Sequence, residues 1–174
     1  MGFALQEYGA AYVDSVSEGT YALEAFLLRF LRDCPTTYVI LGGYSQGAHV
    51  VGDVVEGHLT RDQRRHIAAV AMFGDPRFNP KQPKVDIGGY NNKLSGIATP
   101  LYGARVVDDD IVDRVRSYCL YGDPVCNFSV FNAGTCAPFM PACAHYRYVT
   151  SGYPGIAADT AIKRWRQLQK QNPL

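Results

Sequence analysis

Residues 38–48 read YVILGGYSQGA, and this stretch decides the fold. Its first four residues form a short, continuous apolar run, which is typical of a parallel strand buried on both faces. Two glycines end the run. A helical pattern follows over residues 46–59, with one apolar face made of Val50, Val51, Val54 and Val55. The stretch therefore predicts a strand, a tight turn and a helix in direct succession.

Further helices and buried strands alternate along the chain. Apolar residues recur at helical spacing over residues 21–33, and Cys34-Pro35 stops that helix. We expect a weak strand at 3–8, a loop at 9–19, buried strands at 67–73 and 115–120, irregular connections at 74–112 and 121–153, and a helix at 156–169. This alternation predicts an α/β fold, a three-layer α/β/α sandwich with a mostly parallel sheet, in a single domain over residues 1–174.

Composition argues against several kinds of partner. Seventeen basic and sixteen acidic residues leave a net charge of +1, which gives no electrostatic basis for binding nucleic acid or anionic membranes. No apolar run reaches the roughly 18 residues of a membrane span. Residues 1–10 have neither a basic start nor a long apolar core, so we expect no signal peptide in this sequence.

Four of the five cysteines form two pairs with identical spacing, Cys119 with Cys126 and Cys136 with Cys143. Metal sites need tighter spacing, such as C-x-x-C, so we predict two local disulfides and no metal site. The alternative is a set of reduced, buried thiols. Disulfides imply an oxidising compartment. Cys34 is left without a partner.

Gly43-Tyr44-Ser45-Gln46-Gly47 fits the pattern G-x-S-x-G between an expected strand and an expected helix. Such a turn presents the serine hydroxyl at the carboxyl edge of the sheet. Ser45 is therefore a candidate nucleophile. The backbone N–H of Gln46 is a candidate oxyanion donor, aided by the positive potential of the helix N-terminus. The alternative is a glycine-flanked turn with an ordinary capping serine.

A serine hydroxyl needs a histidine base that a carboxylate orients, and in α/β hydrolases the chain order is Ser, then Asp or Glu, then His. His49 lies on the helix that follows the serine and is too constrained to serve as base. His58 and His66 look like solvated surface residues. By elimination His145, in a loop after the last expected strand, is the candidate base; the alternative is a structural loop histidine.

Asp123 is the candidate acid, because it follows the last expected strand inside the loop between Cys119 and Cys126. A disulfide would hold this loop still, which benefits a carboxylate that orients an imidazole. Asp75 competes for the role because it follows an earlier strand. Asp108, Asp109 and Asp110 are most simply a solvated charge run.

Together these motifs resemble the cutinase family of α/β-hydrolase serine esterases, which includes acetylxylan esterases. The resemblance covers most of the chain and rests on residues 34–48, on CLYGDPVC at 119–126 and on AHY at 144–146. It implies Ser45 as nucleophile, Asp123 as acid, His145 as base and Gln46 as oxyanion donor. It also implies a secreted enzyme without cofactor or metal that cleaves esters of lipids, polyesters or acylated polysaccharides.

Two features depart from the family pattern. An insertion before His145 carries Phe128, Phe131, Phe139 and Met140, which could line an acyl-binding lip or simply pack the inserted loop. The family also begins with a strand and loop upstream of this sequence, and that loop supplies a second oxyanion donor; residues 3–8 match the strand after it. We therefore expect a chain truncated relative to the family, in which the open sheet edge or Cys34 could form a dimer.

The sequence thus predicts a cutinase-like serine carboxylesterase that acts through a Ser-Asp-His triad and an acyl-enzyme. An acetylxylan-type esterase is the alternative in substrate. A catalytically inactive hydrolase-fold module that binds rather than cleaves is the alternative in class, because loss of one oxyanion donor costs about 10²–10³ in kcat.

Overall fold

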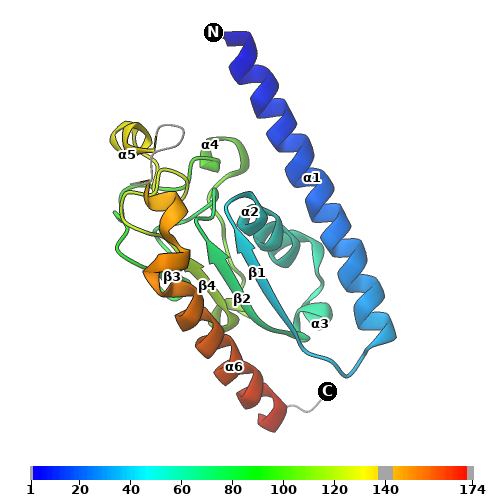
Figure 1. The fold of residues 1–174 in the computed structure, drawn as a ribbon. Coiled ribbons are helices and arrows are strands. Elements are labelled where there is room, and N and C mark those ends of the chain that lie inside the picture. Colours follow the sequence, from blue (N-terminus) through cyan, green and yellow to red (C-terminus); the bar gives the residue numbers. More distant parts are fainter. Residues whose placement is uncertain (1, 137–142, 172–174) are drawn as a thin grey trace.

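A parallel β-sheet forms the centre of the computed structural model, which describes residues 2–136 and 143–171 (Figure 1). Within these residues the strands lie in the order β1-β2-β4-β3, and each neighbouring pair is parallel. The strands are β1 (Val39–Tyr44), β2 (Ile67–Phe73), β3 (Asp86–Ile87) and β4 (Val115–Tyr118). The helices are α1 (Gly2–Asp33), α2 (Gln46–Asp53), α3 (Arg61–Arg64), α4 (Thr99–Tyr102), α5 (Val130–Thr135) and α6 (Tyr153–Gln171).

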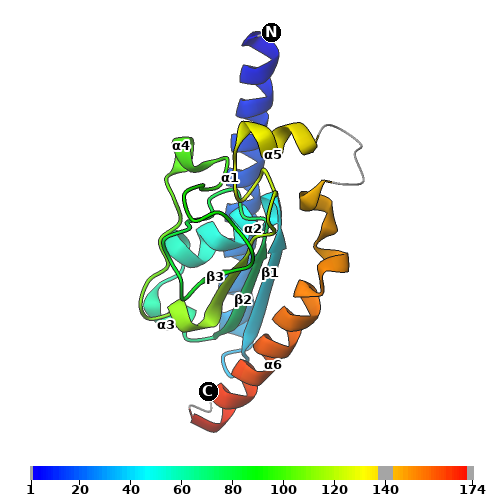
Figure 2. The same ribbon diagram turned by 90° about the vertical axis from the view of Figure 1, so that its left-hand side faces the viewer.

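Helices cover both faces of the sheet (Figure 2). On one face α2 packs on β1 and α1 packs on α2, while α6 lies against β2 on the other face. The predicted three-layer α/β/α sandwich is therefore confirmed. The carboxyl ends of β1 and β2 point toward the end of the molecule where α4 and α5 lie (Figure 1).

The first helix is much longer than the sequence pattern suggests. The expected strand at 3–8 and loop at 9–19 are wrong, because α1 runs without a break from Gly2 to Asp33. Over residues 9–33, the buried side chains of this helix are Val16, Thr20, Leu27 and Leu31, which share one helical face. Gly19 allows close packing on α2, since a Cβ there would lie 3.0 Å from Val50 Cγ2. Packing against α2 thus outweighs the low helix propensity of the glycines and serines in this segment.

The main core lies between the sheet and the helices α1 and α2. It contains Leu27, Val54, Ile67 and Met72, which are all at most 1% exposed. As predicted, β2 is buried along most of its length. The prediction that β1 is buried on both faces is wrong. Ile40 is 48% exposed, because α6 packs on β2 and β1 is an edge strand within the described residues.

Other boundaries differ modestly from expectation. α2 ends at Asp53 and continues as a π-helical turn, Val54–His58. The segment 74–112 holds β3 and α4, and β4 ends at Tyr118. No helix in the described ranges is long and apolar enough to cross a membrane.

The expectation of a solvated charge run at Asp108, Asp109 and Asp110 holds for Asp108 and Asp109, which are exposed, and is wrong for Asp110, whose side chain is 14% exposed. Asp108 and Asp110 form ion pairs with Arg64, with N–O distances of 3.0 and 2.8 Å. Arg64 is only 8% exposed, and a buried guanidinium needs such partners to offset its lost hydration.

Candidate active site

Ser45 lies in the tight turn between β1 and α2. Its φ of 56° is the only positive φ of a non-glycine residue in the described part of the chain. A left-handed backbone costs an L-residue about 1–2 kcal/mol, and a strained serine between strand and helix is the geometry of a nucleophile elbow. A Cβ at Gly43 would overlap the backbone of Gly47, so the tight turn requires glycine at position 43, two residues before Ser45.

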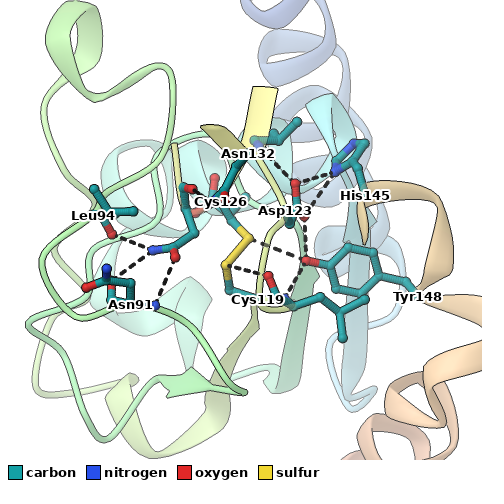
Figure 3. The surroundings of a disulfide bond; sticks show 12 residues. Asn91, Leu94, Cys119, Asp123, Cys126, Asn132, His145 and Tyr148 are labelled. Atoms are coloured by element: carbon teal, nitrogen blue, oxygen red, sulfur yellow. Dashed lines mark hydrogen bonds and ion pairs between the residues drawn. A yellow bond between two sulfur atoms is a disulfide. The ribbon is translucent and has the colours of Figure 1, made fainter. Parts of the chain in front are cut away.

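His145 faces Ser45 from a 3-10 turn, Ala144–Arg147. Its Nε2 lies 2.8 Å from Ser45 Oγ, and its Nδ1 lies 3.0 Å from each carboxylate oxygen of Asp123. In Figure 3 the imidazole and the carboxylate point toward each other. Asp123 is fully buried and His145 is 7% exposed. The fold therefore brings together the three residues that the sequence order singled out, although they are separated by up to 100 positions.

Asp123 lies in a loop that follows β4 and is closed by the disulfide Cys119–Cys126. The backbone N–H of Val125 donates to Asp123 Oδ1 at 2.8 Å. The buried Asn127 ties the end of the loop to the backbone of segment 91–94 through three hydrogen bonds. The loop thus holds the carboxylate in one orientation.

Two tyrosines that the sequence analysis did not single out also contact these groups. The hydroxyl of Tyr44 donates to the carbonyl oxygen of His145 at 2.8 Å, and its ring stacks on the imidazole with centroids 4.9 Å apart. The hydroxyl of Tyr148 donates to Asp123 Oδ2. Burial raises the pKa of Tyr44, so this hydroxyl keeps its proton. The sequence could have pointed to these tyrosines only by their positions. Tyr44 directly precedes Ser45, and Tyr148 follows His145 by three residues.

The backbone N–H of Gln46 is available to an oxyanion. Within the described residues it donates no hydrogen bond, whereas the N–H groups of Ala48 and His49, further along α2, donate to the carbonyl oxygen of Ser45. The start of a helix also carries positive potential. Gln46 can therefore donate to negative charge that develops beside Ser45 Oγ.

The other three histidines have partners elsewhere. His49 is fully buried and bonds Tyr12 through Nδ1 at 2.9 Å. The expectation that His58 and His66 are solvated is wrong. His58 is half-buried and pairs with Glu24 at 2.8 Å, and His66 Nδ1 lies 3.3 Å from a backbone carbonyl.

Asp75, the competing acid, faces a cation instead of an imidazole. It is fully buried, and its two oxygens lie 2.7 and 3.2 Å from Nε and Nη2 of Arg105. Arg105 also contacts Asp53 and Glu56 at 3.0 Å each. Burial lowers the pKa of Arg105, but the charge of Asp75 and its neighbours outweighs it and raises the pKa, so the guanidinium stays charged. Asp75 thus belongs to an ion-pair cluster beneath α2.

The cysteines pair as their spacing predicts. Cys119 bonds Cys126, Cys136 bonds Cys143, and Cys34 is free. Within the described residues no group of three metal-ligating side chains is found. Of the expected lip, Phe128 and Phe131 are 39% and 89% exposed, while Phe139 and Met140 lie outside the described residues.

The chain is similar in sequence to one protein family and to esterases within it. The model of the family described as Cutinase matches residues 4–164. Carboxylesterase Culp1 of Mycobacterium tuberculosis is 30% identical over 158 residues, which are 88% of this chain and 59% of the relative. Acetylxylan esterase of Hypocrea jecorina is 30% identical over 136 residues, which are 68% of this chain and 41% of the relative. The chain therefore spans about 59% and 41% of the length of these two relatives.

The fold has solved counterparts as well. The catalytic core domain of acetyl xylan esterase from Trichoderma reesei matches with a TM-score of 0.69 and 24% identity, covering 88% of this chain and 72% of that one. A cutinase-like protein from Cryptococcus matches with a TM-score of 0.58 and 19% identity, covering 82% of this chain and 69% of that one. At these identities the likeness shows a shared fold.

Proposed function

The chain belongs to the cutinase family, and from this premise we propose that it is a serine carboxylesterase acting through Ser45, His145 and Asp123. One observation carries the proposal. The imidazole of His145 lies 2.8 Å from Ser45 Oγ through one nitrogen and 3.0 Å from Asp123 through the other. Acyl transfer by a serine requires that the nucleophile be hydrogen-bonded to a base and that the base be hydrogen-bonded to a buried carboxylate.

Acylation begins when Ser45 Oγ attacks the carbonyl carbon of the ester while His145 Nε2 takes the hydroxyl proton. The carbonyl oxygen becomes an oxyanion, which accepts a hydrogen bond from the backbone N–H of Gln46. Asp123 stabilises the imidazolium through Nδ1. The tetrahedral intermediate then collapses, the bond to the alcohol oxygen breaks, and His145 returns its proton to the leaving alcohol.

Deacylation repeats these steps with water. His145 takes a proton from a water molecule, whose oxygen attacks the carbonyl carbon of the acyl-enzyme. When this second intermediate collapses, the bond to Ser45 Oγ breaks and the proton returns to the serine. The products are a carboxylic acid and the free enzyme, and the reaction consumes one water molecule.

The acyl part of the substrate would lie against an exposed apolar surface near α5. Phe131 is 89% exposed and Phe128 is 39% exposed. Their segment lies at the end of the molecule toward which the carboxyl ends of β1 and β2 point (Figure 1). Exposed apolar side chains contribute to binding sites when they form a continuous patch. They support an ester of a lipid or polyester as the substrate.

An acetylated polysaccharide is the second candidate substrate. Two matched relatives are named acetylxylan esterases, at 27% and 30% identity. Ser45 and Gln46 are half-exposed and Gly47 is exposed, so the nucleophile is accessible to a polymer chain. Two disulfides, Cys119–Cys126 and Cys136–Cys143, support an extracellular site of action for either substrate.

The test is hydrolysis of p-nitrophenyl acetate, butyrate, octanoate and laurate by the full chain. Ser45→Ala should abolish turnover, whereas Ser15→Ala, at an exposed serine on α1, should not change it. An organophosphonate should label the parent protein and the Ser15→Ala variant, but not Ser45→Ala. Preference for butyrate or longer chains indicates a lipid or polyester ester, and activity confined to acetate indicates a sugar ester. A folded protein that neither hydrolyses nor becomes labelled would be a binding module, and the proposal would be wrong.

A further inference from the structure

We propose that Tyr148 is a positioning residue of this site: its buried hydroxyl fixes the carboxylate of Asp123, and through it the imidazole of His145. The inference rests on the proposed esterase function. It adds Tyr148 to the series of hydrogen bonds that joins Ser45, His145 and Asp123. Tyr148 does not reach Ser45 or the reacting atoms, so its effect passes through Asp123.

The hydrogen bonds of Tyr148 give its hydroxyl one direction. The oxygen accepts the backbone N–H of Leu120 at 3.1 Å, and the hydroxyl donates to Asp123 Oδ2 at 2.7 Å. Its oxygen also lies 3.4 Å from Cys126 Sγ. Since the N–H of Leu120 occupies one acceptor position of the oxygen, the hydroxyl hydrogen is left to point at the carboxylate of Asp123. Figure 3 shows the side chains of Tyr148 and Asp123 joined by this interaction.

The two oxygens of Asp123 have separate donors. Oδ1 accepts from the N–H of Val125 at 2.8 Å, and Oδ2 accepts from Tyr148. His145 Nδ1 lies between them, 3.0 Å from each. The terminal torsion of an aspartate is soft, so one donor alone would leave the carboxylate free to turn about that contact. A donor on each oxygen fixes its plane and centres the imidazole.

Burial keeps the tyrosine a neutral donor. Tyr148 is 4% exposed, and burial together with the charge of Asp123 raises its pKa above the ordinary value. In the part of the chain that the structure describes, the titratable groups that face Asp123 are His145, Tyr44 and Tyr148. The cysteines beside it are in a disulfide and do not titrate. Tyr148 therefore donates throughout the pH range in which a histidine base works.

The ring of Tyr148 is fixed as well. It packs edge-on against Phe73, Tyr44 and His145, with centroid distances of 6.0, 5.8 and 6.3 Å. Tyr148 follows His145 by three residues at the end of a 3-10 turn. Side chains at i and i+3 eclipse in such a turn, so both can reach Asp123. The same local geometry thus delivers the base and the group that orients its acid.

The test compares Tyr148→Phe with the parent chain on p-nitrophenyl butyrate across pH, with active sites counted by organophosphonate titration. Loss of the donor should lower kcat about tenfold and leave KM unchanged, because the geometry of the base is disturbed rather than substrate binding. It should also move the acidic limb of the kcat/KM profile upward by about half a pH unit, because Asp123 then presents more negative charge to the imidazole.

Tyr90→Phe is the matched control. Tyr90 is half-buried against Phe78 beside the same disulfide, and its hydroxyl has no partner within the described residues. It should leave kcat and the pH profile unchanged. If Tyr148→Phe also leaves both unchanged, or loses only active-site count with an unmoved profile, the residue is merely structural and the inference is wrong. If the parent chain neither hydrolyses esters nor reacts with the phosphonate, the proposed function itself has failed and this inference fails with it.

Discussion

Gly74 lies directly against the imidazole of His145. A Cβ at Gly74 would stand 2.9 Å from His145 Cε1 and 3.0 Å from Asp123 Oδ2. The residue follows the last residue of β2, donates its N–H to the carbonyl of Tyr118 at 2.9 Å and has a φ of 62°. The end of β2 therefore lies so close to the imidazole of His145 that no side chain fits at Gly74.

Gly74→Ala should lower kcat on p-nitrophenyl butyrate about 100-fold, because an added methyl group must displace the base or its acid. It should also lower the free energy of unfolding by about 1–2 kcal/mol, because alanine is strained at this φ. Steady-state kinetics and urea unfolding measure the two effects separately.

Gly103→Ala separates the backbone effect from the contact. Gly103 has a φ of 76°, but a Cβ there would meet nothing within 4 Å. This variant should lose a comparable amount of stability and keep its kcat. If Gly103→Ala lost as much kcat as Gly74→Ala, the contact with His145 would not be the cause.

Breaking the buried ion-pair cluster around Arg105 should strongly destabilise the protein. Arg105 is 2% exposed between Asp75, Asp53 and Glu56, and it also donates to the carbonyl of His49 in α2. Arg105→Met would leave Asp75 buried without its cation, which should cost about 3–5 kcal/mol in the free energy of unfolding. Urea unfolding measures this loss.

Two further variants check the assignment. The double variant Arg105→Met with Asp75→Asn should recover part of the loss, because neither charge is then left unpaired. Arg32→Met removes an arginine whose side chain is 72% exposed in its pair with Asp33, and it should change stability by less than about 1 kcal/mol. Strictly additive losses in the double variant would mean that Arg105 and Asp75 do not depend on each other.

The parts of the fold that local sequence decides were predictable. The apolar run before Ser45 and the glycines around it predicted the succession of strand, turn and helix, although not the exposed face of β1 or the π-helical continuation of α2. α1 was not predictable over residues 9–19, because its burial comes from Gly19 and Val16 packing on a helix 30 residues later. The open face of β1 was not predictable either, since it depends on where α6 packs.

For the site, chain order and motif were enough to nominate Ser45, Asp123 and His145. The groups that surround them were not predictable, because they act through contacts that no local pattern records. Tyr44 reaches the backbone of His145 across 101 positions. Gly74 affects the site because its missing side chain leaves room for His145 and Asp123. Asp75 and Asp123 both follow strands, and only the fold gives one of them Arg105 and the other an imidazole.

The Cys119–Cys126 disulfide should affect activity as well as stability, because the loop that it closes contains Asp123. Replacing both cysteines by alanine should cost about 2.5 kcal/mol in the free energy of unfolding in the chain-entropy model. It should also lower kcat about tenfold, since the disulfide helps to hold the carboxylate. The Cys136–Cys143 pair has the same separation of 7 and encloses none of the three residues, so its double alanine variant should lose similar stability and less activity. Equal losses of kcat in the two variants would contradict this assignment.

Asp86 should make stability depend on pH. It is 7% exposed, and burial raises its pKa to about 7, although a backbone hydrogen bond from Gln82 opposes the shift. Because the folded-state pKa lies above the unfolded one, the native state holds this proton more tightly, so stability falls as pH rises from about 4 to about 7 and levels off above.

Asp86→Asn keeps an acceptor for Gln82 and removes the charge. The variant should resemble the parent chain near pH 4 and be more stable by on the order of 3 kcal/mol near pH 8. Urea unfolding at several pH values measures this difference. Asp109→Asn, at an exposed aspartate, supplies the control and should show a flat difference over the same range. If the advantage of Asp86→Asn did not grow between pH 4 and pH 7, burial of this carboxylate would not be what destabilises the protein at neutral pH.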